Sequence, residues 1–167
     1  MKKYELTKET VTISEKTLYR IRAVRDFGSV KTGDLGGYIE KEENLSHFDD
    51  AWVSGNAKVF DNAEVSGNGK VSGNANVFDN ARISGNAEIF NTRHFCTQGP
   101  IGSRNGFVTF YRTKDNTVEV KCGCFLGSLQ EFVNQVEKTH KGNKYEKEYK
   151  LAAELAKVCI RLEGKSK

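Results

Sequence analysis

A glycine-rich segment with one arginine offers the clearest binding chemistry in the sequence. It reads Gly99-Pro100-Ile101-Gly102-Ser103-Arg104-Asn105-Gly106. Glycines let backbone N–H groups turn towards an anion, the Ser103 hydroxyl can donate a hydrogen bond, and the Arg104 guanidinium can form a forked contact with a phosphate. Because the segment lacks the Lys-[Ser/Thr] ending of a nucleotide P-loop, it can also be a connector that simply needs glycines.

Aromatic and basic side chains follow this segment closely. Tyr111 is the aromatic residue that we expect to reach a ligand and stack on a base, with an arginine beside it. In so small a module, the aromatic residues can instead form the core. The predicted ligand-binding group consists of Ser103, Arg104, Asn105, Tyr111, Arg112 and Lys114.

Cys122-Gly123-Cys124 and His140 have the residue types of a metal site. A closed zinc site usually has four ligands, and Cys-x-Cys is tighter than the common Cys-x₂-Cys spacing. Cys96 and His94 could complete the set, but nothing in the sequence ties them to the pair. We therefore interpret the cysteines as small buried residues, and we predict neither a metal nor a cofactor.

Catalytic chemistry has little support in the sequence. His47, His94 and His140 are the only histidines and hence the only candidates for a histidine general base. No carboxylate pair and no nucleophile–base motif stands out. We predict no catalytic residue.

A six-residue repeat fills the middle of the chain and must position these groups. Its small residue comes two places before each β-branched one, and the Gly-Asn and Asp-Asn pairs suit left-handed corners. Such a period fits a parallel β-helix with one short strand per hexad. The motif VFDNA recurs at 59–63 and 77–81, so residues 18 apart should stack on one face. The β-branched positions are Val53, Val59, Val65, Val71, Val77, Ile83 and Ile89.

The same spacing places Phe60 above Phe78 in an outward aromatic ladder. An exposed apolar ladder usually needs a cover. The cover can be the protein's own N- or C-terminal segment or a neighbouring subunit, and the prediction assigns Phe60 and Phe78 to an oligomer interface.

The hexads resemble the left-handed β-helix of the hexapeptide-repeat superfamily. They depart from the usual acyltransferase pattern in having Ser or Phe immediately after the aliphatic residue. That resemblance implies a homotrimer. LYRIRAVRDFGSVKTGDLGGYIEKEENLS at 18–46, GPIGSRNGFVTFYRTKD and VKCGCFLGSLQEF extend it to a class of phage and prophage proteins. No catalytic residue can be carried over from that class.

The C-terminal segment predicts a small α+β module. Phe107–Thr113 and Thr117–Cys122 are strand-like, with a turn between them. Capping signals at Ser128 and Asn143 introduce two helices with apolar faces. The predicted order is therefore strand, strand, helix, helix.

The predicted fold class is mainly β: a left-handed parallel β-helix of hexapeptide repeats with about 2.5 coils, an N-terminal β cap and the C-terminal α+β module. Residues 1–38 form the cap strands, 39–98 the β-helix, and 99–167 the module with a β-hairpin and two helices.

Charge and composition limit the partners. Residues 99–167 carry 13 Lys and Arg against 8 Asp and Glu, which suits a small anion. The bases are not clustered into a stripe, so long nucleic acid is not expected. The N-terminus lacks a signal-peptide core and no run approaches a membrane span, so we expect a cytosolic protein without a membrane partner. The resemblance to phage proteins implies that this is the cytoplasm of the bacterial host.

Together these features predict a phage-type, non-catalytic protein. It would bind a small anionic ligand in pockets of a homotrimer and sequester a nucleotide immune signal of the bacterial host, as an anti-defence protein does. The alternatives are a hexapeptide-type acyltransferase and a structural or assembly protein that docks a protein partner.

Overall fold

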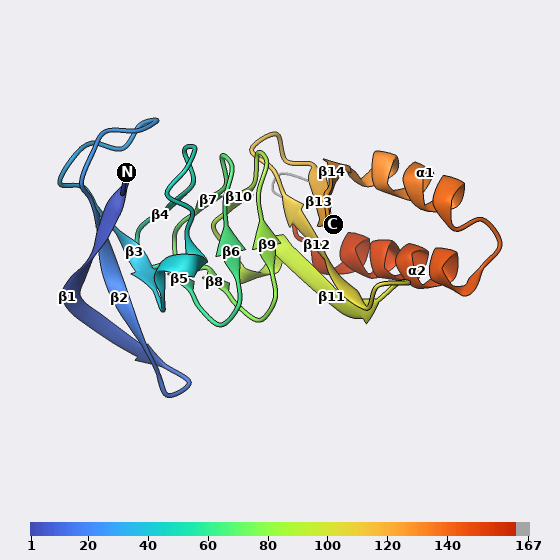
Figure 1. Cartoon of the computed structure of the whole chain (residues 1–167), viewed down its shortest axis with the longest axis horizontal. Helices are drawn as coiled ribbons and strands as arrows, with labels where there is room; N and C mark the ends of the chain where they lie inside the picture. The colour runs from blue at the N-terminus through green and yellow to red at the C-terminus, as the bar shows by residue number, and fades with distance from the viewer. Residues whose placement is uncertain (163–167) are drawn as a thin grey trace. The chain divides into compact units, whose positions relative to one another are not determined.

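A computed structural model describes residues 1–162 of the 167-residue chain. The chain divides into two compact units, Met1–Thr92 and Arg93–Lys167. The N-terminal strands and the repeats belong to the first unit (Figure 1). Its strands are β1 (Tyr4–Ile13), β2 (Lys16–Ala23), β3 (Leu35–Ile39), β4 (Trp52–Val53), β5 (Lys58–Val59), β6 (Glu64–Val65), β7 (Lys70–Val71), β8 (Asn76–Val77), β9 (Arg82–Ile83) and β10 (Glu88–Ile89).

A β-hairpin begins the first unit. Its turn residues, Ser14 and Glu15, have φ values of 49° and 65°, and a left-handed pair of this kind matches the twist of the two strands. Strand β3 pairs antiparallel with β2 and parallel with β5, where Ile39 lies opposite Val59. The hairpin is thereby joined to the repeats in a five-stranded sheet, β1-β2-β3-β5-β8.

Each hexad contributes a two-residue strand whose second residue is a fully buried Val or Ile. Parallel pairs join residues 18 positions apart, as in Val53 with Val71 and Val71 with Ile89. The prediction that such residues stack is confirmed. The small residue before each strand is also buried, and a close-packed interior favours a small side chain there.

The corner of each hexad is a single left-handed residue. Gly occupies it in the VSGN hexads and Asp in the VFDN hexads, with φ values between 53° and 63°. The Asn that follows is not left-handed in any hexad of the described chain, so only the first member of each predicted pair makes the corner. These corner residues are Gly55, Asp61, Gly67, Gly73, Asp79 and Gly85.

The strand pairing overturns the predicted fold class. Over residues 1–162 the protein is mixed α/β, and its strands form four separate sheets, of five, three, four and two strands. None of these sheets is closed or curled into a helix, so the predicted left-handed parallel β-helix of about 2.5 coils over 39–98 is wrong. Each hexad offers only two paired residues before its left-handed corner, which confines hydrogen bonding to small sheets built from every third hexad.

The second unit combines an antiparallel sheet, in the order β11-β12-β13-β14, with two helices that lie side by side (Figure 1). Among residues 1–162, neither helix is long and apolar enough to cross a membrane. The elements are β11 (Phe95–Ile101), β12 (Gly106–Arg112), β13 (Val118–Cys122), β14 (Phe125–Ser128), α1 (Leu129–Thr139) and α2 (Lys144–Cys159).

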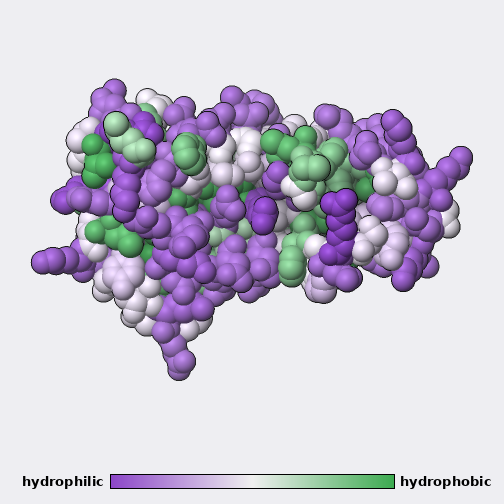
Figure 2. All heavy atoms as spheres, in the orientation of Figure 1, coloured by the Kyte–Doolittle hydropathy of each residue, from purple (hydrophilic) through white to green (hydrophobic). Residues whose placement is uncertain are grey.

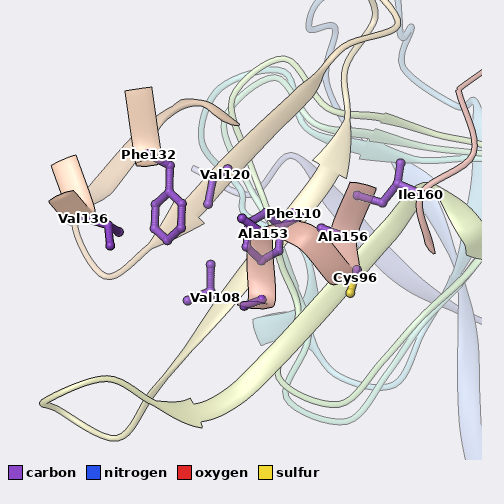
Figure 3. Packing of buried hydrophobic residues seen from close by; sticks show 10 residues of the cluster. Cys96, Val108, Phe110, Val120, Phe132, Val136, Ala153, Ala156 and Ile160 are labelled. Carbon is purple, nitrogen blue, oxygen red and sulfur yellow. The ribbon is translucent and has the colours of Figure 1, made fainter. Parts of the chain in front are cut away.

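The core of this unit lies between one face of the sheet and both helices. Val108, Phe110 and Val120 project from the strands towards Phe132 of α1 and Ala153 of α2 (Figure 3). On the molecular face drawn in Figure 2, hydrophilic residues cover most of the surface and hydrophobic ones gather in small patches. Val108 and Phe110, two positions apart on β12, therefore face the same core, whereas Phe107 on the other face of the strand is exposed.

Local signals in the second unit are confirmed. The Ser128 hydroxyl accepts from the Glu131 N–H, and the Asn143 side chain accepts from two N–H groups of the first turn of α2. Strands β12 and β13 correspond to the two predicted strands, whereas β11 and β14 were not predicted, so the order of four strands and two helices corrects the predicted order. Both missed strands contain glycine, and β11 also contains Pro100, residues that disfavour a strand prediction.

Candidate functional site

Residues 102–105 of the glycine-rich segment form the hairpin turn between β11 and β12, while residues 99–101 end β11 and Gly106 begins β12. Gly102 and Asn105 have φ values of 78° and 50°, and the Asn105 N–H donates to the Gly102 carbonyl oxygen at 3.3 Å. The predicted binding residues Ser103, Arg104 and Asn105 are exposed in this turn. The segment is therefore a surface turn of the second unit, with its basic residue open to solvent.

Tyr111 and Arg112 are not exposed. The Tyr111 side chain is fully buried, and its hydroxyl donates to Glu119 Oε1 at 2.8 Å. Burial and the Glu119 carboxylate raise the pKa of the Tyr111 phenol. The Arg112 side chain is also buried, and its Nε donates to Asn116 Oδ1 at 3.2 Å. Tyr111 therefore belongs to the packed interior, where no face of its ring is open for a ligand.

The structure does not bring the predicted ligand-binding group together. Arg104 lies in the turn before β12, whereas Arg112 ends that strand and Lys114 lies in the turn after it. A seven-residue strand separates the two turns by about 20 Å, at roughly 3.3 Å per residue. Ser103, Arg104 and Asn105 can act at one ligand, but Tyr111, Arg112 and Lys114 belong to the opposite end of the sheet.

A cavity of about 160 Å³ lies between the β13–β14 turn and the two helices. Aromatic rings form much of its wall: Phe132 makes edge contacts with Phe125 and Tyr149, at centroid distances of 5.6 and 5.8 Å. The His140 ring lies 5.5 Å from that of Tyr149. The lining residues are Cys122, Phe125, Phe132, Gln135, Val136, Thr139, His140 and Tyr149.

The cavity contains two of the residues considered for a metal site, Cys122 and His140. Cys124 is exposed, and residues 1–162 contain no group of three or more His, Cys, Asp or Glu side chains placed to hold a metal ion. Burial raises the pKa of the Cys122 thiol, which keeps the thiol protonated. The thiol is thus a poor nucleophile as well as a poor metal ligand.

Tyr149 connects this cavity with the glycine-rich turn. Its ring lines the cavity, while its hydroxyl packs so closely over Gly102 that a Cβ there would overlap it. Burial and the neighbouring Cys122 and Glu148 raise the pKa of the Tyr149 phenol, and the positive charge of Arg104 acts in the opposite direction. Arg104 therefore lies within electrostatic reach of the aromatic wall.

No family model matches the sequence, and no curated protein matches it.

Sequence reasoning missed Glu148 and Tyr149 as site residues. The Gly102 N–H donates to Glu148 Oε1 at 2.8 Å, a contact between residues 46 positions apart. Tyr145 and Tyr149 are four positions apart, a spacing that places both on one apolar helix face and is typical of core residues. Nothing in the sequence indicates that the end of this face meets the glycine-rich turn.

The aromatic ladder is covered by the protein itself. The Phe60 and Phe78 rings stack at 5.5 Å, and Phe60 is only 7% exposed. Leu18 of β2 and Tyr38 of β3 pack against Phe60, and partly buried Val11, Ile13 and Phe78 complete the cluster. The N-terminal hairpin thus covers Phe60 within one chain, and the assignment of Phe60 and Phe78 to an oligomer interface stays a prediction.

The remaining histidines are structural. His47 stacks on the Tyr4 ring at 4.2 Å, and its Nδ1 accepts from the Lys3 N–H at 3.1 Å. Burial lowers the pKa of His47, while Glu42 acts in the opposite direction. His94 is fully buried. Neither imidazole lines the cavity around Tyr149.

Proposed function

We propose that the C-terminal unit binds a small anionic ligand with a planar group, and that this ligand is a nucleotide held without turnover. One observation carries the proposal: the Tyr149 ring belongs both to the aromatic cavity and to the Arg104 turn. A base and its phosphate could therefore be recognised side by side. A cavity with an apolar wall and a few polar groups is the usual form of a small-molecule site.

The two halves of the site have different chemistry. Aromatic faces stack on nucleobases, and each stacked base contributes about 1–3 kcal/mol. Arg104 supplies a planar guanidinium that can contact a phosphate through two parallel hydrogen bonds. Because Ser103 is exposed beside it, the turn also has a hydroxyl donor for the same group.

Binding without turnover is the version that the side chains support. The pKa of Cys122 is raised, so its thiolate is disfavoured at neutral pH. The His140 ring contacts the Tyr145 and Tyr149 rings at centroid distances of 5.8 and 5.5 Å. It therefore forms part of the aromatic wall around the cavity.

The resemblance to phage and prophage proteins suggests which nucleotide to test. In this version the protein sequesters a nucleotide immune signal in the cytoplasm of the bacterial host. The homotrimer also stays a prediction. Native mass spectrometry of protein purified from the host would measure the oligomeric state and identify a ligand that is retained intact.

Thermal-shift measurements on the full chain test the proposal with cyclic dinucleotides, ADP-ribose and acyl-coenzyme A. A ligand that binds only the folded protein raises Tm with its concentration. We expect a nucleotide to raise Tm, and Arg104→Ala to weaken that shift. Lys114→Ala removes the same charge from an exposed turn at the far end of β12 and is the matched control.

Equal nucleotide affinity in the wild type and Arg104→Ala would exclude this site. A shift with acyl-coenzyme A followed by acyl transfer would instead indicate the acyltransferase. A protein that responds to none of these ligands would contradict nucleotide binding.

A further inference from the structure

The glycine-rich turn already holds an anion from its own chain. The Glu148 carboxylate, on α2, accepts a hydrogen bond of 2.8 Å from the Gly102 N–H. Hydrogen bonds between a backbone N–H and a carboxylate are charge-assisted and stronger than neutral ones. Glu148 is half-buried, so water screens this contact only in part.

Two further backbone N–H groups of the turn are also available to an anion. The N–H groups of Ser103 and Arg104 have no backbone acceptor within residues 1–162. The Glu148 carboxylate therefore occupies the backbone donor at the start of a turn that has further N–H groups and a guanidinium close by. Arg104 and Glu148 both act electrostatically on Tyr149, so a phosphate bound by Arg104 would lie near this negative charge.

We infer that Glu148 is an internal anion that competes with the ligand anion at the turn and sets its affinity. This inference rests on the proposed nucleotide function and adds to it a specificity-determining residue. Because its carboxylate repels a phosphate of the same sign, Glu148 favours ligands of low charge and disfavours densely charged ones. Tyr149, the next residue after Glu148, forms part of the cavity wall. Displacement of the Glu148 carboxylate would therefore affect both the turn and the cavity.

Glu148→Gln tests the inference, because the amide oxygen of Gln can keep the Gly102 hydrogen bond while the charge is removed. We expect this variant to bind ADP and inorganic pyrophosphate roughly 3- to 10-fold more tightly than the wild type, as for a partly screened charge. The gain should be larger for pyrophosphate and should shrink at high salt. Isothermal titration at two salt concentrations measures all three effects.

Glu154→Gln is the matched control, since it makes the same change on the same helix at an exposed carboxylate paired with Lys157. Its affinity should equal that of the wild type. An unchanged or weaker affinity in Glu148→Gln would overturn the inference. If Arg104→Ala is weaker in the same experiment, the proposed function still stands.

An independent readout follows the Gly102 amide in the ¹⁵N-labelled wild-type chain. Its resonance should move when pyrophosphate is added, because its acceptor changes from the carboxylate to the ligand. A Gly102 resonance that stays in place while pyrophosphate binds would also overturn the inference. Absence of ADP and pyrophosphate binding in all the proteins would overturn the inference, whereas the proposed function is decided separately by the thermal shifts with cyclic dinucleotides and ADP-ribose.

Discussion

The repeat region and the C-terminal unit are built on different kinds of contact. In the repeats, each inward Val or Ile that pairs within the hexads meets another Val or Ile 18 positions away, as Val53 meets Val71. In the C-terminal unit, the contacts join unlike residues at irregular separations, such as Gly102 and Glu148, 46 positions apart. The repeat region therefore uses one kind of contact many times, whereas each contact of the C-terminal unit occurs once.

This difference explains where the candidate site lies. A buried Val or Ile in every hexad leaves the interior of the repeats filled by similar side chains, without unlike groups placed together. The C-terminal unit brings a thiol, an imidazole, aromatic rings and a basic turn around Tyr149. Binding chemistry needs such unlike neighbours, so a regular array serves better as support than as a site.

Phe110→Ala should have the largest effect and should separate the two units. Phe110 is fully buried and meets Phe132 edge-on at 5.7 Å, so its truncation should lower the free energy of unfolding by about 3–5 kcal/mol. Urea unfolding has two suitable probes. Helical circular dichroism reports on the C-terminal unit, which contains both helices, and fluorescence of Trp52, the one tryptophan, reports on the repeat unit.

We expect Phe110→Ala to shift the helical transition and to leave the Trp52 transition in place. Equal shifts in both signals would show that the two units unfold as one, and would break the comparison.

Phe60→Ala should weaken the repeat unit and not the association of chains. Because Phe60 packs under Leu18 and Tyr38, we expect a loss of about 3 kcal/mol in the Trp52 transition. The oligomeric state, measured by light scattering, should not change. Phe48, which is 76% exposed, provides the control: Phe48→Ala should change the free energy of unfolding by less than about 0.5 kcal/mol.

Lys3 should make the stability of the repeat unit depend on pH. Its ammonium is fully buried and donates to the carbonyl oxygens of Phe48, Asp49 and Ala51 at 3.2, 3.3 and 2.7 Å. Burial, with smaller effects from Lys70 and Arg25, lowers the pKa of Lys3 from 10.5 to about 8.

Between pH 8 and 10.5 the unfolded chain therefore binds the proton more strongly than the folded one, so the free energy of unfolding rises with pH. This group adds at most about 3 kcal/mol over that window. The difference between wild type and Lys3→Met in the Trp52 transition measures its contribution. A difference that stays constant or falls as pH rises would contradict the lowered pKa.

The smallest effects are expected at the left-handed corner residues of the hexads. Gly73 has a φ of 63°, and a Cβ there would lie 3.0 Å from the Phe90 carbonyl oxygen, so Gly73→Ala should cost about 1–2 kcal/mol. Asp79 has a φ of 59°, and Asp79→Gly replaces it by the residue found at the other corners. The free energy of unfolding of this variant should stay within about 0.5 kcal/mol of wild type. Equal losses in the two variants would show that corner geometry does not decide this position.

The sequence by itself determined the local features of this protein. The hexads specify which residues are buried and that residues 18 apart pair, because side-chain size alternates locally and the pattern recurs every three hexads. They also place a left-handed corner at each Gly-Asn or Asp-Asn pair, but do not specify which member of the pair makes it. The capping residues Ser128 and Asn143 are local in the same sense. Such features repeat or act within one turn, so they can be predicted without the fold.

Only the tertiary structure decided the rest. It divided the strands into four sheets, covered Phe60 with the N-terminal hairpin, buried Tyr111 beside Glu119 and placed Glu148 on the glycine-rich turn. Each outcome depends on which distant segments pack together, and no period or spacing encodes that choice. The residues around Tyr149 became a candidate site when the fold placed the end of one apolar helix face against a turn 46 positions earlier.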